Sequence, residues 1–186
     1  MTADESVVEG DLKGYLESLT KMSSERARNK VAQDTGKDAF IKADWLPDYF
    51  YQKLIDEINR LYRSKLPVAL ATLIRKLLEN LIIDILRRRY GNSGIGLYYN
   101  TSKERFLDFS TLVKNLDSKK ADFQHITQNL GMAITDINHF KEAGNRSAHS
   151  IDVQITIDDF AKDRERINHL VQLLLRIIQN IEAERG

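Results

Sequence analysis

The apolar positions of this chain recur mostly at the spacing of α-helices. The clearest case is residues 67–90, where leucines and isoleucines repeat every three or four positions over several turns. Such a pattern gives a helix a wide apolar face. We therefore expect a long, heavily buried central helix from Pro67 to Tyr90. Its apolar positions are Leu70, Leu73, Ile74, Leu77, Leu78, Leu81, Ile82, Ile85 and Leu86.

The preceding segment, residues 47–63, carries a single apolar face and predicts a second helix. Pro47 suits the first turn of a helix, where a missing N–H does no harm, and Asp44 is a candidate cap nearby. The pair Leu66-Pro67 then separates this helix from the next one.

Shorter elements are expected after residue 90. The glycine-rich residues 91–96 lack the Gly-Lys-Ser/Thr ending of a phosphate-binding loop, and no apolar strand precedes them, so we interpret them as a loop between helices. Three short helices are predicted next. They run from Thr101 or Ser102 to Leu116, from Phe123 to Gly131, and from Ile134 to Gly144, where glycine suits a left-handed carboxyl cap.

The last part of the chain changes pattern twice. Residues 151–157 alternate apolar and polar positions, which we interpret as an extended connector. A final helix is predicted to start near Thr156, Asp158 and Asp159 and to end at about Glu182. It carries two apolar stripes, one for the domain core and a second that could face a partner chain.

These elements predict an all-α fold, a helical bundle that spans residues 45–186. Residues 1–44 are polar and acidic with weak periodicity, so we interpret them as an N-terminal arm that is helical or partly disordered. We therefore predict two parts, an arm over residues 1–44 and one domain over residues 45–186.

Composition limits the chemistry available to the protein. The chain has 186 residues and no cysteine, which excludes disulfides, a thiol nucleophile and thiolate metal sites. Charged residues interrupt every long apolar run, and the first residues lack the apolar core of a secretory signal. We expect a cytoplasmic protein that does not enter a membrane.

The net charge of +1 is unevenly distributed. Residues 60–90 carry eight Lys and Arg against two Asp and Glu, a net charge of +6, whereas residues 1–59 carry −4 and residues 91–186 carry −1. A basic segment can face phosphate groups, but solvated helix faces are often as basic. Both interpretations stay open at this point.

One short stretch, residues 140–150, gathers side chains suited to acid–base chemistry on a phosphate. His149 can take or give a proton near neutral pH, and Asn145 can orient it or bind an oxyanion. Arg146 and Lys141 can neutralise a phosphate. This set suits cleavage of RNA, in which a base takes the 2′-hydroxyl proton and a cation stabilises the charge on phosphorus.

A structural interpretation of the same stretch stands beside the catalytic one. Asn145 and Ser147 can satisfy free backbone groups at a helix end, with His149 packed in the core or an interface. Elsewhere, Arg75 and Glu79 are four positions apart and can pair on one helix face. The candidate catalytic residues are His149, Asn145 and Arg146, and the candidate substrate-binding residues are Lys141, Arg75, Glu79 and Ser150.

The remaining histidines give no sign of a metal centre. No two of the histidines are four positions apart, and no triplet of carboxylates accompanies one of them. We therefore predict no metal and no cofactor. The three histidines outside residues 140–150 are His125, His139 and His169.

Two motifs make the chain resemble the HEPN superfamily of all-helical domains, and in particular an uncharacterised branch marked by Gly-Asn-x-x-Ala-His. The first motif is Gly144-Asn145-Arg146-Ser147-Ala148-His149. The second, Arg75-Lys76-Leu77-Leu78-Glu79, matches an Arg-x-x-Leu-Glu pattern on an early buried helix of that branch. The order of helices in the branch corresponds to about residues 47–182.

The resemblance implies a helical bundle that forms a homodimer, with the histidine corners meeting at the interface. In active members it implies metal-independent RNA cleavage, often in defence or toxin–antitoxin systems. Those members place their arginine further from the histidine than Arg146 is from His149. The alternative is a non-catalytic dimeric module that binds a partner protein or a nucleotide, and the sequence leaves both functions open.

Overall fold

A computed structural model describes residues 39–149 and 155–185, with the backbone alone for residues 143–149. These ranges form an all-α helical bundle of five α-helices, accompanied by two 3-10 helices and one small hairpin. None of the helices in these ranges has the length and apolar character needed to cross a membrane. The elements are α2 (Tyr49–Arg63), α3 (Pro67–Tyr90), η1 (Gly91–Leu97), β1 (Tyr99–Asn100), β2 (Arg105–Phe106), α4 (Phe109–Ser118), η2 (Lys120–Phe123), α5 (Leu130–His149) and α6 (Ile157–Ala183).

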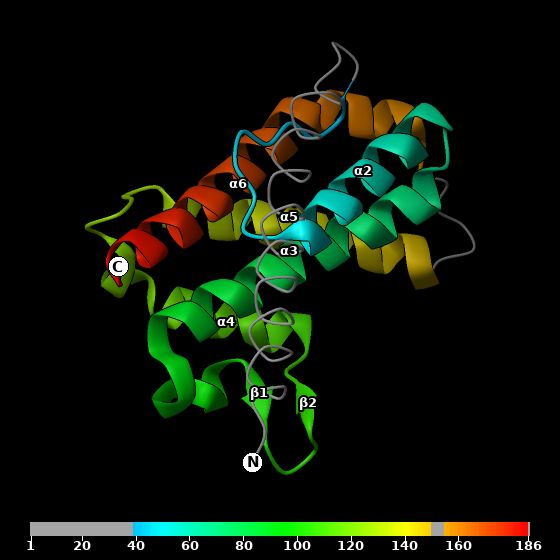
Figure 1. Ribbon diagram of the computed structural model, residues 1–186. Helices are drawn as coiled ribbons and strands as arrows, with labels where there is room; N and C mark the ends of the chain where they lie inside the picture. The colour runs from blue at the N-terminus through cyan, green and yellow to red at the C-terminus, as the bar shows by residue number, and fades with distance from the viewer. Residues whose placement is uncertain (1–38, 150–154, 186) are drawn as a thin grey trace, which may run out of the picture.

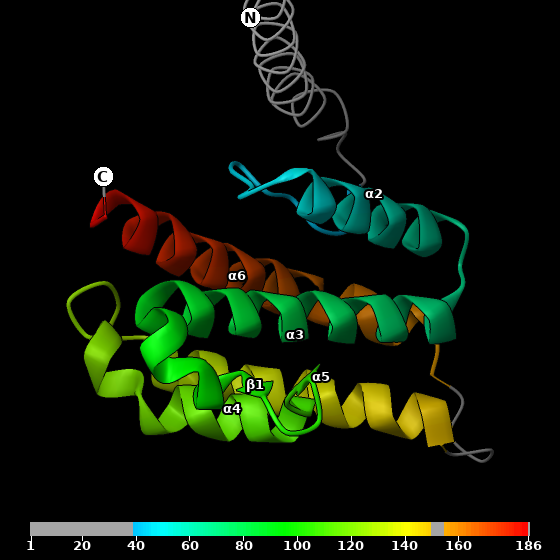
Figure 2. The same cartoon turned by 60° about the horizontal axis from the view of Figure 1, so that its bottom comes forward.

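Helix α3 is the central element, as its apolar pattern predicted. It contacts α2, α4, α5 and α6, and Figure 2 shows α2 on one side of the bundle, α3 and α6 in the middle, and α4 and α5 on the other side. Seven of its apolar side chains are fully buried, and each such burial contributes roughly 1.5–3 kcal/mol. They are Leu70, Leu77, Leu78, Leu81, Ile82, Ile85 and Leu86, each 0% exposed.

The ends of α2 and α3 follow from local chemistry. The expectation that Asp44 caps α2 is wrong, because Asp48 is the cap: its carboxylate accepts the N–H groups of Phe50 at 2.9 Å and Tyr51 at 3.2 Å. Helix α3 spans Pro67–Tyr90 as predicted and ends at Gly91, whose φ of 56° lies in the left-handed region that glycine tolerates.

The predicted helix from Thr101 or Ser102 begins several residues later. A short hairpin occupies its start, with Tyr99 paired to Phe106. Helix α4 then begins after Asp108, whose carboxylate accepts the N–H of Thr111 at 3.0 Å. The apolar positions from Leu112 to Leu116 are helical as expected, but Phe106 belongs to a strand.

Helix α5 contains the short helix predicted from Ile134 to Gly144, whereas the helix predicted from Phe123 to Gly131 does not form, because residues 124–129 lie between η2 and α5. Helix α5 starts at Leu130 and remains helical to His149, so neither Gly131 nor Gly144 ends a helix. A glycine inside a helix costs about 1 kcal/mol relative to alanine. Burial of the apolar face of α5 outweighs that cost, since it fixes the helix against α3 and α4. The buried positions on this face are Leu130, Ala133, Ile134, Ile137 and Phe140.

Helix α6 confirms the predicted final helix. Thr156 and Asp159 form a reciprocal capping box at its start, and the helix continues to Ala183. The second apolar stripe of α6 does not face a partner chain, because Leu170 and Ile177 are buried within the same chain. The extended connector predicted for residues 151–157 falls mostly outside the described residues.

A segment without regular secondary structure, residues 39–43, packs into the core although the sequence interpretation assigned it to the arm. Ala39, Phe40, Ile41 and Ala43 are all buried. Residues 1–38 of that arm lie outside the described residues, so the domain described here begins no later than Ala39.

Side-chain amides from two helices hold this segment in place. The amide of Asn59 on α2 accepts the N–H of Ile41 at 2.8 Å and donates to its carbonyl at 3.0 Å. From α6, Asn168 accepts the N–H of Lys42 at 2.8 Å and donates to the carbonyl of Phe40. The segment belongs to no helix or sheet, so these side chains supply the partners that regular structure would otherwise give its backbone.

Replacing Asn59 with alanine should lower the free energy of unfolding by about 2–4 kcal/mol, because the buried N–H and carbonyl of Ile41 lose their partners. Urea unfolding of the full chain measures this change. Asn180→Ala is the matched control, since the Asn180 amide is exposed and bonds only within α6. Equal losses in the two variants would show that the Asn59 clamp contributes nothing of its own.

Candidate functional site

A cleft on one side of α3 brings together the second resemblance motif and the hairpin. Its cavity volume is about 430 Å³. Helix α3 supplies side chains at positions three and four apart, which therefore share one face, and β2 supplies an aromatic ring. The lining residues are Thr72, Arg75, Lys76, Glu79, Asn80, Ile83 and Phe106.

Arg75 is held at the cleft by an aromatic contact. Its guanidinium lies over the ring of Phe109 at 5.5 Å from the ring centre, within the range of a cation–π interaction. Phe109 is the first residue of α4 and is itself buried. The guanidinium of Arg75 is thus held against α4, and Arg75 lines the cleft.

Glu79 lies one turn further along α3 and has an altered acidity. Burial raises the pKa of its carboxyl above the usual value, and the negative charge of Asp108 raises it further, whereas the positive charge of Arg75 lowers it. Burial is the largest of these effects. Arg75 and Glu79 therefore interact electrostatically, as their spacing predicted, in a partly desolvated setting.

Phe106 forms the rim of the cleft on the hairpin side. Its side chain is 49% exposed, which is unusual for a phenylalanine. The ring meets Tyr99 edge-on, with 5.5 Å between ring centres and 84° between planes. This cross-strand pair fixes the direction of the Phe106 ring while leaving much of its surface open.

The Gly-Asn-x-x-Ala-His motif occupies the last turns of α5. Figure 2 shows α5 running antiparallel to α3, so the motif lies at the end of the bundle where α3 begins. Positions 141, 145 and 149 are each one helical turn apart. The side chains of Asn145, Arg146 and His149, and the whole of Ser150, lie outside the described residues.

Lys141 is the described candidate nearest to that motif. Its ammonium group donates to the amide oxygen of Asn138 at 3.2 Å and lies 3.4 Å from a carboxylate oxygen of Glu142. Its side chain is only 13% exposed. Lys141 does not line the α3 cleft, so the structure brings Arg75 and Glu79 together but leaves Lys141 at a separate place.

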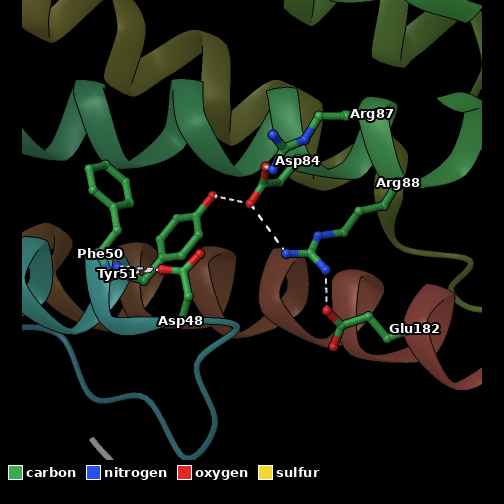
Figure 3. A network of polar contacts seen from close by, with 7 residues as sticks. All are labelled: Asp48, Phe50, Tyr51, Asp84, Arg87, Arg88 and Glu182. Atoms are coloured by element: carbon green, nitrogen blue, oxygen red, sulfur yellow. Dashed lines mark hydrogen bonds and ion pairs between the residues drawn. The ribbon is translucent and has the colours of Figure 1, made fainter. Parts of the chain in front are cut away.

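The three consecutive arginines at the end of α3 are all held in ion pairs. Figure 3 shows Asp84, whose carboxylate lies 2.6 Å from Arg87 and 3.8 Å from Arg88, with Arg88 also paired to Glu182 of α6. Arg89 pairs in turn with Glu184 at 2.8 Å. Arg87, Arg88 and Arg89 are therefore largely neutralised within the fold.

Asp84 is also the centre of a buried polar network that joins three helices. Tyr51 of α2 donates its hydroxyl to Asp84 of α3 at 2.9 Å. Burial and the nearby Asp84 charge both raise the pKa of the Tyr51 hydroxyl, so the tyrosine stays protonated and keeps donating. Through Arg88 and Glu182 the same network reaches the end of α6, which makes it a structural tie.

No group of three or more metal-ligating side chains occurs within residues 39–149 and 155–185. Comparisons with models of protein families, with curated proteins and with solved structures found no match to this chain.

Sequence reasoning missed part of the cleft. Thr72, Lys76 and Asn80 recur every four positions beside Arg75 and Glu79, a polar stripe that the sequence contains. Phe106 could not be assigned to the cleft, because its place depends on the hairpin that brings it to α3.

The pKa of the Glu79 carboxyl should be measurably above 4.5, the ordinary value for glutamate. Arg75→Gln should raise it further, because a favourable positive charge is lost, and Asp108→Asn should lower it. Titration of the labelled carboxyl carbons by NMR measures both changes. A Glu79 pKa at or below the ordinary value, unmoved by either substitution, would contradict this description of the cleft.

Proposed function

We propose that this protein is a HEPN-like RNA-binding protein that works as a homodimer and acts on the RNA backbone at the Asn145–His149 corner. The proposal places it in the cytoplasm, in keeping with the expectation from the sequence. The resemblance of the two motifs motivates it, and the all-α bundle with a long central helix and a long final helix is compatible with it.

One observation carries the proposal: α5 stays helical through Gly144 to His149. A helix rises 1.5 Å per residue, so Asn145 and His149 are about 6 Å apart along its axis, and Lys141 and Asn145 are separated equally. The helical register therefore places a lysine, an asparagine and a histidine at successive turns.

This order of residue types suits cleavage of a phosphodiester through the 2′-hydroxyl of RNA. In the proposed reaction His149 accepts the 2′-hydroxyl proton, and the oxygen attacks the adjacent phosphorus. The bond to the 5′-oxygen then breaks, and that oxygen takes up a proton. Asn145 would orient the imidazole, and Lys141 and Arg146 would stabilise the negative charge on phosphorus.

The second candidate function is a non-catalytic dimeric module that binds a partner protein or a nucleotide. The neutralised arginines at positions 87–89 favour it, because they remove much of the positive field expected from the basic segment. The burial of the Lys141 side chain beside Glu142 also favours this second function.

The two functions predict different results with purified protein and structured RNA in the presence of EDTA. The first predicts cleavage, and His149→Ala should reduce its rate by at least about 100-fold, because acid–base catalysis typically contributes 10²–10⁴-fold. Gel analysis of the RNA fragments measures the rate, and analytical ultracentrifugation measures the dimer.

His139→Ala is the matched control, because His139 lies on the same helix and is exposed beside Asp163. It should cleave like the unaltered protein. Absence of RNA binding and cleavage in every form, with loss of the dimer in His149→Ala, would contradict the first function and support the second.

A further inference from the structure

We propose that the α3 cleft binds one nucleotide of a single-stranded nucleic acid, with its base stacked on Phe106 and its phosphate at Lys76. This inference rests on the proposed RNA-binding function and assigns to it a binding site away from the histidine corner. It follows from the ring, the charges and the size of the cleft.

The ring of Phe106 is placed as a stacking platform. It is 49% exposed at the rim, and the Tyr99 ring stands at right angles to it, so about half of the Phe106 surface stays open to a ligand. Proteins that bind single strands commonly stack unpaired bases on such rings. A base within a duplex already stacks on its neighbours, which is why the ring selects a single strand.

A cation lies on the same cleft. Lys76 is exposed and has no ion-pair or hydrogen-bond partner for its ammonium group among the described residues. Arg75 adds a second positive charge, and Glu79 is the one carboxylate among the lining residues. Burial raises the pKa of Glu79, which weakens its repulsion of a phosphate only toward acidic pH. At neutral pH the lining side chains still carry a net positive charge.

The size of the cleft also limits its ligand. Small-molecule sites usually have volumes of roughly 300–1,000 Å³. The cleft, at about 430 Å³, lies in the lower part of that range and has room for a single nucleotide. The lining asparagine and threonine provide polar groups beside the ring, and both already make hydrogen bonds within α3.

Binding of short fluorescent oligonucleotides tests the site in the full chain. The probes are a single-stranded 2′-O-methyl RNA, which lacks the hydroxyl needed for cleavage, a single-stranded DNA of the same sequence, and the corresponding RNA duplex. Fluorescence anisotropy at several salt concentrations gives the affinity and its salt dependence.

Phe106→Ala should weaken binding of the single-stranded RNA by about 5- to 150-fold, because stacking of one base is lost. It should leave the salt dependence unchanged. Lys76→Gln should instead lower the slope of log affinity against log salt by about 0.7, the value for one phosphate contact on a single strand. A general loss of structure would not separate the two effects in this way.

The chain offers closely matched controls on α2, which lies on the opposite side of α3 from the hairpin in Figures 1 and 2. Phe50 is 45% exposed and meets Tyr51 edge-on at 5.3 Å, much as Phe106 meets Tyr99. Phe50→Ala and Lys53→Gln should change affinity by less than about twofold, within the usual effect of surface substitutions.

The outcomes separate this inference from the function on which it rests. If the protein binds the RNA but the Phe106 and Lys76 variants behave like their controls, the cleft assignment is wrong and the RNA-binding function stands. If the unaltered protein binds no probe, both are wrong. An equal effect of Phe106→Ala on the single-stranded DNA supports the site, whereas equally tight binding of the duplex contradicts it.

Discussion

The fold depends on the burial of one helix that is apolar around most of its circumference. Seven leucines and isoleucines of helix α3 would expose a large apolar surface to water if the helix were isolated. Helices α2, α4, α5 and α6 all pack on α3 and bury these side chains completely. The other polar features follow from this arrangement. Asp84 lies in the interior on α3, where an unpaired carboxylate would be costly. Tyr51 donates a hydrogen bond to it, and two arginines balance its charge.

The same constraint decides which residues remain for function. Once four helices have covered α3, its polar side faces the hairpin and forms the cleft with Phe106. Arginines at the end of α3 form ion pairs with Glu182 and Glu184 at the end of the chain's last helix. These ion pairs stabilise the fold and largely neutralise the arginine charges. Arg75 and Lys76, in the middle of the helix, place positive charge on the cleft itself.

The sequence predicted those parts of the fold that local patterns determine. The bounds of α3 and the course of α6 follow from apolar periodicity and capping residues. The predictions failed where tertiary contacts overrode local signals: burial carries α5 through Gly144, and amides from α2 and α6 fix residues 39–43. At the candidate site, the electrostatic interaction of Arg75 with Glu79 followed from helical spacing alone. The contribution of Phe106 could not be predicted from the sequence, because it requires a long-range contact between the hairpin and α3.

Native-state hydrogen exchange tests the central role of α3 most directly. Amides from Leu77 to Leu86 should exchange only when the whole domain unfolds, because most of the side chains in this range are buried among the other helices. Their exchange free energies should therefore equal the global free energy of unfolding obtained with denaturant. Exchange of these amides with a lower free energy than those of α2 and α6 would show that α3 opens independently, and would contradict the account.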